Sequence, residues 1–116
     1  MTTVVGSVQE LWQFPVKSMG GTRYDAVTLT EQGVLGDRVY AVIDVETGRV
    51  ASAKSVRAFP DLLRCRATFV EAPRAGESLP PVRIELPNGR SVSSDSSDAD
   101  RTLSAHWRRD MRLAQV

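Results

Sequence analysis

Cysteine is almost absent from this chain, since Cys65 is the only one among 116 residues. A lone cysteine excludes an internal disulfide and is typical of a protein in a reducing compartment. Histidine is equally scarce, because His106 stands alone, so the Cys and His spacings of zinc sites are missing. No phosphate-binding loop, glycine-rich dinucleotide turn or nucleophile elbow is present either. The common sequence signatures of enzymes are therefore lacking.

Long hydrophobic runs and an excess of one charge are also missing. The longest apolar run, residues 39–43, is far too short to span a bilayer, and the N-terminus lacks the basic start and apolar stretch of a signal peptide. Fifteen basic residues balance 14 acidic ones, so the net charge is +1. Such a balance gives no long-range attraction to nucleic acid or anionic membranes. We expect a cytoplasmic protein that binds neither.

Aromatic residues are few: two tryptophans, two tyrosines and three phenylalanines. A β-barrel that binds single-stranded nucleic acid needs stacking platforms and a basic groove. The near-neutral charge and the scarcity of aromatic rings both argue against that class. Only an observation of salt-dependent binding to single-stranded DNA would support it.

Alternation of apolar and polar residues is the dominant pattern in what is present. In residues 63–70, Leu63, Cys65, Ala67 and Phe69 fall on one face, which predicts a half-buried strand. Four further stretches are predicted as strands on the same grounds or on their β-rich composition: 7–14, 25–30, 38–45 and 82–86. The final run, 111–116, is a candidate for one more.

Turn residues separate these stretches. Asn88-Gly89 is the dipeptide that takes a positive φ at both centres of a type I′ hairpin, and Gly48 stands where a short hairpin loop needs it. Residues 30–38 form a longer loop with two glycines, and residues 71–81 form a polar, proline-rich excursion.

One helix is predicted near the C-terminus. Ser97 or Asp98 is the candidate N-cap, and Leu103 and Trp107 share one apolar stripe. Arg108 and Arg109 are predicted in the last turn, where the helix dipole favours cations. Together with six to eight mostly antiparallel strands, this predicts a mainly β domain over residues 1–116, with one short C-terminal helix. We favour a small β-barrel, because closure hides strand edges.

The two residues most often found in catalytic sites have simpler interpretations here. Cys65 lies in phase with Leu63 and Phe69, so it is expected to be a buried small hydrophobic residue and not a reactive thiol. His106 lies on the predicted helix, where a surface or capping role is expected before catalysis.

The basic residues at the ends of predicted strands offer a candidate anion site. Lys17 and Ser18 follow Pro15, Arg38 opens a strand, and Lys54 lies just past another. Guanidinium and ammonium groups suit phosphate oxygens, a hydroxyl adds a short donor, and Gly20-Gly21 permit close backbone approach. The alternative is that each is a solvated surface cation, with Arg38 pairing with Asp37 or a nearby carboxylate.

Three blocks of this sequence resemble the N-terminal β-barrel domain of MOSC proteins. They are LWQFPVKSMGG, LTEQGVLGDRVYAVID and the stretch from GRVASAK to FPDLL, in an order and spacing covering roughly residues 5–115. MOSC denotes the C-terminal domain of molybdenum cofactor sulfurase, and the family includes that sulfurase and the amidoxime-reducing components. The paired FPVKS and GVLGDR motifs carry most of the resemblance.

The resemblance implies a site and a function. In amidoxime-reducing relatives the lysine and serine of PVKS and the arginine of GDR contact molybdopterin, which implies cofactor-binding roles for Lys17, Ser18 and Arg38, with Lys54 as a further basic position. The family's metal-ligating cysteine belongs to the MOSC domain that follows the barrel, so Cys65 does not take that role and no metal ligand or catalytic residue is assigned. This chain ends about where that domain would begin.

The implied function is that of an accessory domain. It would help a MOSC domain, in cis or in trans, to bind and orient the molybdenum cofactor for redox or sulfur-transfer chemistry, and the chain alone is expected to be inactive and to bind no cofactor tightly. The alternative is a structural or protein-interaction module without a cofactor, packing on a partner through an apolar patch around Trp12 or Trp107. Convergence of Lys17, Ser18 and Arg38 in one cleft would distinguish the two.

Overall fold

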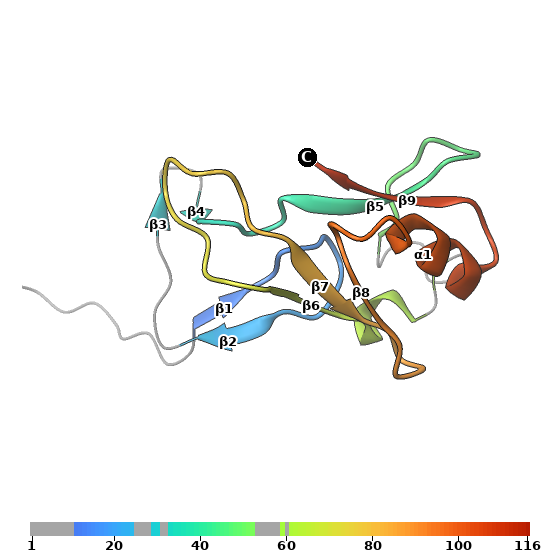
Figure 1. Ribbon diagram of the computed structural model, residues 1–116, viewed down its shortest axis with the longest axis horizontal. Helices are drawn as coiled ribbons and strands as arrows, with labels where there is room; N and C mark the ends of the chain where they lie inside the picture. The colour runs from blue at the N-terminus through green and yellow to red at the C-terminus, as the bar shows by residue number, and fades with distance from the viewer. Residues whose placement is uncertain (1–10, 25–28, 31–32, 53–58, 60) are drawn as a thin grey trace, which may run out of the picture.

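Short antiparallel strands and one C-terminal helix surround the core of this protein (Figure 1). The computed structural model describes residues 11–24, 29–30, 33–52, 59 and 61–116. Its elements in chain order are β1 (Leu11–Gln13), β2 (Thr22–Tyr24), β3 (Leu29–Thr30), β4 (Gly33–Val34), β5 (Tyr40–Asp44), the 3-10 helix η1 (Leu62–Arg64), β6 (Arg66–Phe69), β7 (Val82–Glu85), β8 (Ser91–Ser93), α1 (Ala99–Trp107) and β9 (Met111–Gln115). The predicted mainly β class with one short C-terminal helix is confirmed.

The strands of the described part form four separate sheets and no closed barrel. The pairs are β1–β2, β3–β4 and β5–β9, and the fourth sheet has the order β6–β7–β8. Two isolated bridges link two of these sheets: Val16 pairs with Tyr40, the first residue of β5, and Gly20 pairs with Arg66, the first residue of β6. The segment from residue 16 to residue 20 therefore joins the β5–β9 pair to the three-stranded sheet.

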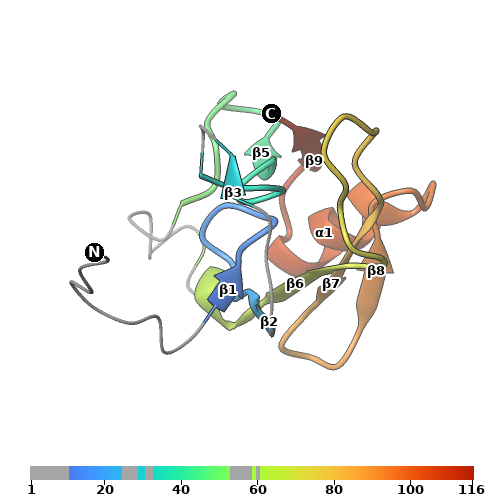
Figure 2. The ribbon, with the colours of Figure 1, turned by 90° about the vertical axis from the view of Figure 1, so that its left-hand side faces the viewer.

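Helix α1 joins the β5–β9 pair to the three-stranded sheet. It packs against both β8 and β9, and Figure 2 shows it between β9 and the strands β6 to β8. Its side chains also cover the free edge of β9: the Ser104 hydroxyl accepts from the Met111 amide at 2.8 Å, and Asp100 accepts from the Leu113 amide at 3.0 Å. These bonds satisfy edge groups that would otherwise be open to pairing with another chain.

The core lies between these elements and follows the predicted alternation. In β7, Val82 and Ile84 are buried and their neighbours Arg83 and Glu85 are exposed. The buried stripe of α1 consists of Ala99, Leu103 and Trp107, as the helical spacing predicts. The fully buried side chains include Val16, Val42, Leu62, Val82, Ile84, Leu103 and Met111. No helix of the described residues has the length and apolar character needed to cross a membrane.

The strand predicted over residues 63–70 begins later than expected. Residues 62–64 form η1, and only Arg66–Phe69 are strand. Leu63 was expected on the buried face with Cys65, yet it is 66% exposed. A 3-10 helix turns by one third of a circle per residue, so the two-residue period breaks before Cys65 and Leu63 points outward.

The hairpin between β7 and β8 forms at the predicted dipeptide but with a different turn. Gly89 has φ of +88°, whereas Asn88 is not among the described residues with positive φ, so the predicted type I′ turn is wrong. The Gly89 amide donates to the Leu86 carbonyl at 3.0 Å, and the Leu86 amide to the Arg90 carbonyl at 2.8 Å. Pro87 has a fixed negative φ, which suits the first central position of a type I turn followed by a glycine in the left-handed region.

The remaining sequence predictions have mixed outcomes. Asp98 is the N-cap of α1, one of the two candidates. The placement of Arg108 and Arg109 in the last turn is wrong, because the helix ends at Trp107 and Arg108 is its C-cap. Gly48 has φ of +71° in the loop after β5, as predicted. Residues 7–10 and 25–28 of two predicted strands lie outside the described residues, and so does Lys54.

Candidate functional site

The turn containing Lys17 and Ser18 lies directly beside the segment that opens β5. The Arg38 amide donates to the Phe14 carbonyl at 2.6 Å, and the Tyr40 amide donates to the Pro15 carbonyl at 3.0 Å. The Lys17 amide completes the pattern by donating to the Tyr40 carbonyl at 3.0 Å. These bonds run the two segments parallel to each other, so the PVKS and GDR motifs are neighbours in space although about 20 residues separate them in the sequence.

Two side chains, one from the loop before β5 and one from β1, fasten the same junction. The Asp37 carboxylate accepts a hydrogen bond from the Phe14 amide at 2.8 Å, and the Gln13 side-chain amide donates to the Leu35 carbonyl at 2.8 Å. Gly36 has φ of +83°, and a Cβ there would lie 2.7 Å from the Phe69 ring. Gly36 and Asp37 of GVLGDR therefore help to hold the backbone on which Lys17 lies.

The predicted site residues differ in their surroundings. Lys17 is exposed and Ser18 is half-buried, and the Arg38 side chain is 70% exposed with its guanidinium 4.0 Å from the Asp37 carboxylate. Ser18 and Arg38 both have left-handed backbone conformations, with φ of +65° and +53°. Among the described residues no hydrogen bond or ion pair joins the side chains of Lys17, Ser18 and Arg38.

Comparison with known protein families matches residues 5–113 to the MOSC N-terminal beta barrel domain. The chain belongs to this family. No curated protein and no solved structure matches the chain. The family description names a β-barrel, whereas the described residues of this MOSC N-terminal domain form an open arrangement completed by a helix.

The glycine pair after the PVKS turn serves the domain's own backbone. A Cβ on Gly21 would lie 2.2 Å from the Gln13 carbonyl oxygen, and one on Gly20 would lie 3.1 Å from the Cys65 carbonyl oxygen. Gly20 also donates to Cys65 and accepts from Ala67 in the bridge to β6. The predicted close approach exists, but its partners are neighbouring strands of the domain.

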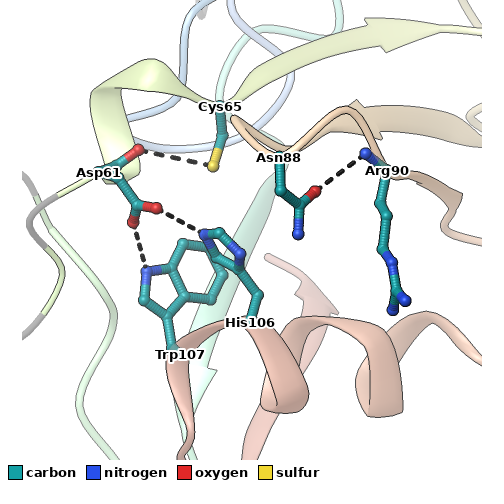
Figure 3. A network of polar contacts seen from close by, with 6 residues as sticks. All are labelled: Asp61, Cys65, Asn88, Arg90, His106 and Trp107. Carbon is teal, nitrogen blue, oxygen red and sulfur yellow. Dashed lines mark hydrogen bonds and ion pairs between the residues drawn. The ribbon is translucent and has the colours of Figure 1, made fainter.

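A buried polar cluster joins η1 to the end of α1 in this MOSC N-terminal domain (Figure 3). Asp61 accepts from the Trp107 indole at 2.8 Å through one oxygen, and its other oxygen lies 2.6 Å from His106 Nε2. The His106 side chain is only 12% exposed, so the predicted surface or capping role is wrong. The rings of His106 and Trp107 also pack edge to face, 4.9 Å apart. This cluster fastens α1 to the start of η1.

Sequence reasoning did not find this cluster, because its members are 45 and 46 residues apart. Phe59 lies beside it, edge to face with Trp107 at 6.1 Å and under the Arg109 guanidinium at 5.6 Å. Arg109 also pairs with the buried Asp44 at 3.2 Å. The adjacency of Trp107 to the lone histidine was the only signal in the sequence, since both side chains prefer a hydrogen-bond partner when buried.

Cys65 is buried, as predicted from its phase in the sequence. Burial away from water, with the negative charge of Asp61 nearby, raises the pKa of the Cys65 thiol from 9.0 to about 12. We expect iodoacetamide to modify the folded protein at neutral to mildly alkaline pH at least about a hundredfold more slowly than the urea-unfolded chain, because the thiolate is the reacting form. The rate of carbamidomethylation, followed by mass spectrometry, measures this, and rapid labelling of the folded protein would contradict it.

The same pKa difference predicts a loss of stability in alkali. The folded protein retains the thiol proton to a higher pH than the unfolded chain does, so the free energy of unfolding falls as the pH rises above 9.0 towards 12. Urea denaturation across this range should show the decline, and the Cys65→Ala variant should show less of it. An equal decline in both proteins would assign the effect to other groups.

An open cleft lies beside the glycine pair. Its volume is about 610 Å³, and its described lining consists of Trp12, Phe14, Gly20, Gly21, Leu63, Arg64, Cys65 and Arg66. Lys17, Ser18 and Arg38 are not among these residues. Nowhere in the described part do three or more His, Cys, Asp or Glu side chains gather as ligands for a metal ion.

Proposed function

We propose that this protein is an accessory domain that helps a MOSC domain, in cis or in trans, to bind and orient the molybdenum cofactor. Membership in the MOSC N-terminal family supports the association with a MOSC domain. Lys17, Ser18 and Arg38 would act as the contacts to the cofactor, and Lys54 would be a further basic contact. When bound, the cofactor supplies redox or sulfur-transfer chemistry at its metal.

The observation that carries this proposal is the left-handed backbone conformation of Ser18 and Arg38. Left-handed conformations are uncommon in residues other than glycine and cluster at functional sites, where the surrounding structure must hold them. The described residues contain three such positions, and the third, Arg108, is the C-cap of a helix, where this conformation is ordinary. The other two fall on two of the proposed contacts, on hydrogen-bonded neighbouring segments.

The chemistry of these side chains fits an anionic group of the cofactor. The Arg38 guanidinium would offer a planar fork of donors to phosphate oxygens, and the Lys17 ammonium would add a point charge. The Ser18 hydroxyl would donate a short hydrogen bond to the same group or to a ring atom. One Asp37 oxygen accepts from the Phe14 amide, and the other lies 4.0 Å from the Arg38 guanidinium. Asp37 would therefore serve to hold Arg38 beside Phe14 and not to contact an anion.

A cofactor-retention experiment tests this proposal. The chain is joined to a MOSC domain, the fusion is purified from cells that make molybdopterin, and the bound pterin is quantified by its fluorescence after oxidation. We expect Lys17→Ala and Arg38→Ala each to lower retained pterin about tenfold, because each removes a charge-assisted contact. Arg74→Ala, at an exposed arginine of the loop after β6, should retain the unmodified level.

Two results would overturn the proposal. Unchanged retention in the Lys17 and Arg38 variants would leave a structural or interaction module as the function. Stoichiometric molybdopterin on the isolated chain, detected by mass spectrometry, would contradict the expectation that a MOSC domain is required.

A further inference from the structure

The strand β1 has an inverted pattern of burial. The polar Gln13 points inward and is 4% exposed, whereas the neighbouring Trp12 is 40% exposed. Gln13 finds one partner in the Leu35 carbonyl, and its side-chain oxygen has no hydrogen-bond partner within the described residues. Turning β1 over would bury the aromatic ring and release the amide to water. The strand thus exposes an aromatic side chain and buries a polar one, the reverse of the usual preference of these residue types.

This outward face is the wall of the 610 Å³ cleft. The rings of Trp12 and Phe14 are stacked on each other, with centroids 6.2 Å apart and planes inclined by 18°. Leu63, turned outward by η1 and 66% exposed, lines the same cleft. A cleft of this volume with aromatic and aliphatic walls is typical of sites for small organic ligands.

The charged side chains among the described lining of the cleft are all positive. Arg64 and Arg66 are both exposed and both line it, and no carboxylate is among its described lining residues. Arg66 is held in place, because its Nε donates to the Gly21 carbonyl at 3.3 Å, which leaves its terminal nitrogens for another acceptor. Glu85 stands opposite Arg66 across the β6–β7 pair, and no ion pair between the two is found in the described part.

From these features we propose that the cleft binds a small planar aromatic anion. Its ring would lie against the apolar wall formed by Trp12, Phe14 and Leu63, and its carboxylate or phosphate would accept hydrogen bonds from Arg64 and Arg66. The proposal does not rest on the proposed function, because Lys17, Ser18 and Arg38 are not among the described residues of the cleft.

Titration with three matched probes tests this inference. The probes are 2-naphthoate, the uncharged 2-naphthalenemethanol with the same ring system, and cyclohexanecarboxylate, an anion without an aromatic ring. Amide and indole signals of the ¹⁵N-labelled protein are followed by NMR. We expect 2-naphthoate to bind in the millimolar range or tighter and each of the other two about tenfold more weakly, because each lacks one of the two recognised features.

The two tryptophans provide an internal control. The Trp12 indole signal and the amides of Gly20, Gly21 and Arg64 should shift with 2-naphthoate, while the Trp107 indole, buried and bonded to Asp61, should not. Equal shifts of both indoles, no shift at millimolar 2-naphthoate, or equal affinity for the uncharged probe would overturn the proposal.

Four variants complete the test. Arg64→Gln should weaken 2-naphthoate binding about tenfold, and Trp12→Leu, which keeps an apolar wall without the indole, should weaken it by a similar factor. Arg74→Gln, the matched exposed arginine outside the cleft, and the combined Lys17→Ala and Arg38→Ala variant should bind like the original protein. Loss of binding in either control would overturn the assignment to this cleft. So would a concentration-dependent dimer whose formation shifts the same signals without any probe, because a second copy would then cover the face.

Discussion

Replacing Gly21 with alanine should destabilise the protein more than any other single methyl addition at a described glycine. The added Cβ would lie 2.2 Å from the Gln13 carbonyl oxygen and 2.8 Å from the Phe14 ring. The first of these neighbours is backbone, so β1 itself must move. We expect a loss of about 3 kcal/mol or more in the free energy of unfolding, because overpacking against a fixed backbone forces a shift of the surrounding strands. Urea denaturation followed by tryptophan fluorescence measures this loss.

Two further glycine variants keep this prediction testable even if Gly21→Ala does not fold. Gly20→Ala, whose Cβ would meet the Cys65 carbonyl oxygen at 3.1 Å, should cost less, because a displacement of a few tenths of an ångström relieves that contact. Gly48→Ala meets nothing within 4 Å and has φ of +71°, so it should lose only about 1 kcal/mol from backbone strain. If Gly21→Ala were as stable as Gly48→Ala, the close packing of β1 on the turn would be contradicted.

Removing the Asp61 carboxylate should produce the second large loss. The Trp107 indole and His106, both largely buried, would keep their polar nitrogens without the present acceptor. Because each buried donor left unsatisfied costs its full desolvation, Asp61→Ala should lower the free energy of unfolding by about 3 kcal/mol. Thermal or urea denaturation measures the loss, and the fluorescence of Trp107 should shift as its surroundings loosen.

Two aspartate variants separate this cluster from a general charge effect. Asp61→Asn keeps an oxygen for the indole but loses the negative charge beside His106, so its loss should be about half that of the alanine variant. Asp98→Ala removes an ion pair with Arg101 whose two side chains are mostly exposed. Asp98 is also the N-cap of α1, but its side chain makes no capping hydrogen bond, so the variant should cost less than about 1 kcal/mol. Equal losses for Asp61→Ala and Asp98→Ala would show that the cluster does not fasten α1.

The candidate site was predictable from the sequence only where its signals are local. FPVKS and GVLGDR each contain proline or glycine residues that predict a turn. Both motifs lie within residues 5–113, which match the family. That Arg38 donates to Phe14, however, depends on pairing between segments more than 20 residues apart. Local periodicity contains no information about such pairing. The left-handed conformations of Ser18 and Arg38 were not predictable either, since neither residue type requires them.

Aromatic residues show the same division. Trp107 was predicted in the buried stripe of its helix, because Leu103 lies one turn away and the helical period defines a face. The outward position of Trp12 could not be derived, because a strand of three residues has two faces and only the neighbouring segments decide which is covered. The exposure of Leu63 had the same origin, in a 3-10 turn that interrupted the alternation.

By itself the sequence determined the mainly β class, the position and N-cap of the helix, the burial of the lone thiol and the family of the domain. These follow from side-chain periodicity, capping residues and short motifs, which are properties of a few consecutive residues. Only the tertiary structure decided that a helix completes the open sheets, that Asp61 joins His106 to Trp107, and that an aromatic cleft with two arginines lies beside the glycine pair. The physical reason is that these features depend on contacts between segments far apart in the sequence. Local patterns of a few consecutive residues do not determine which of those contacts form.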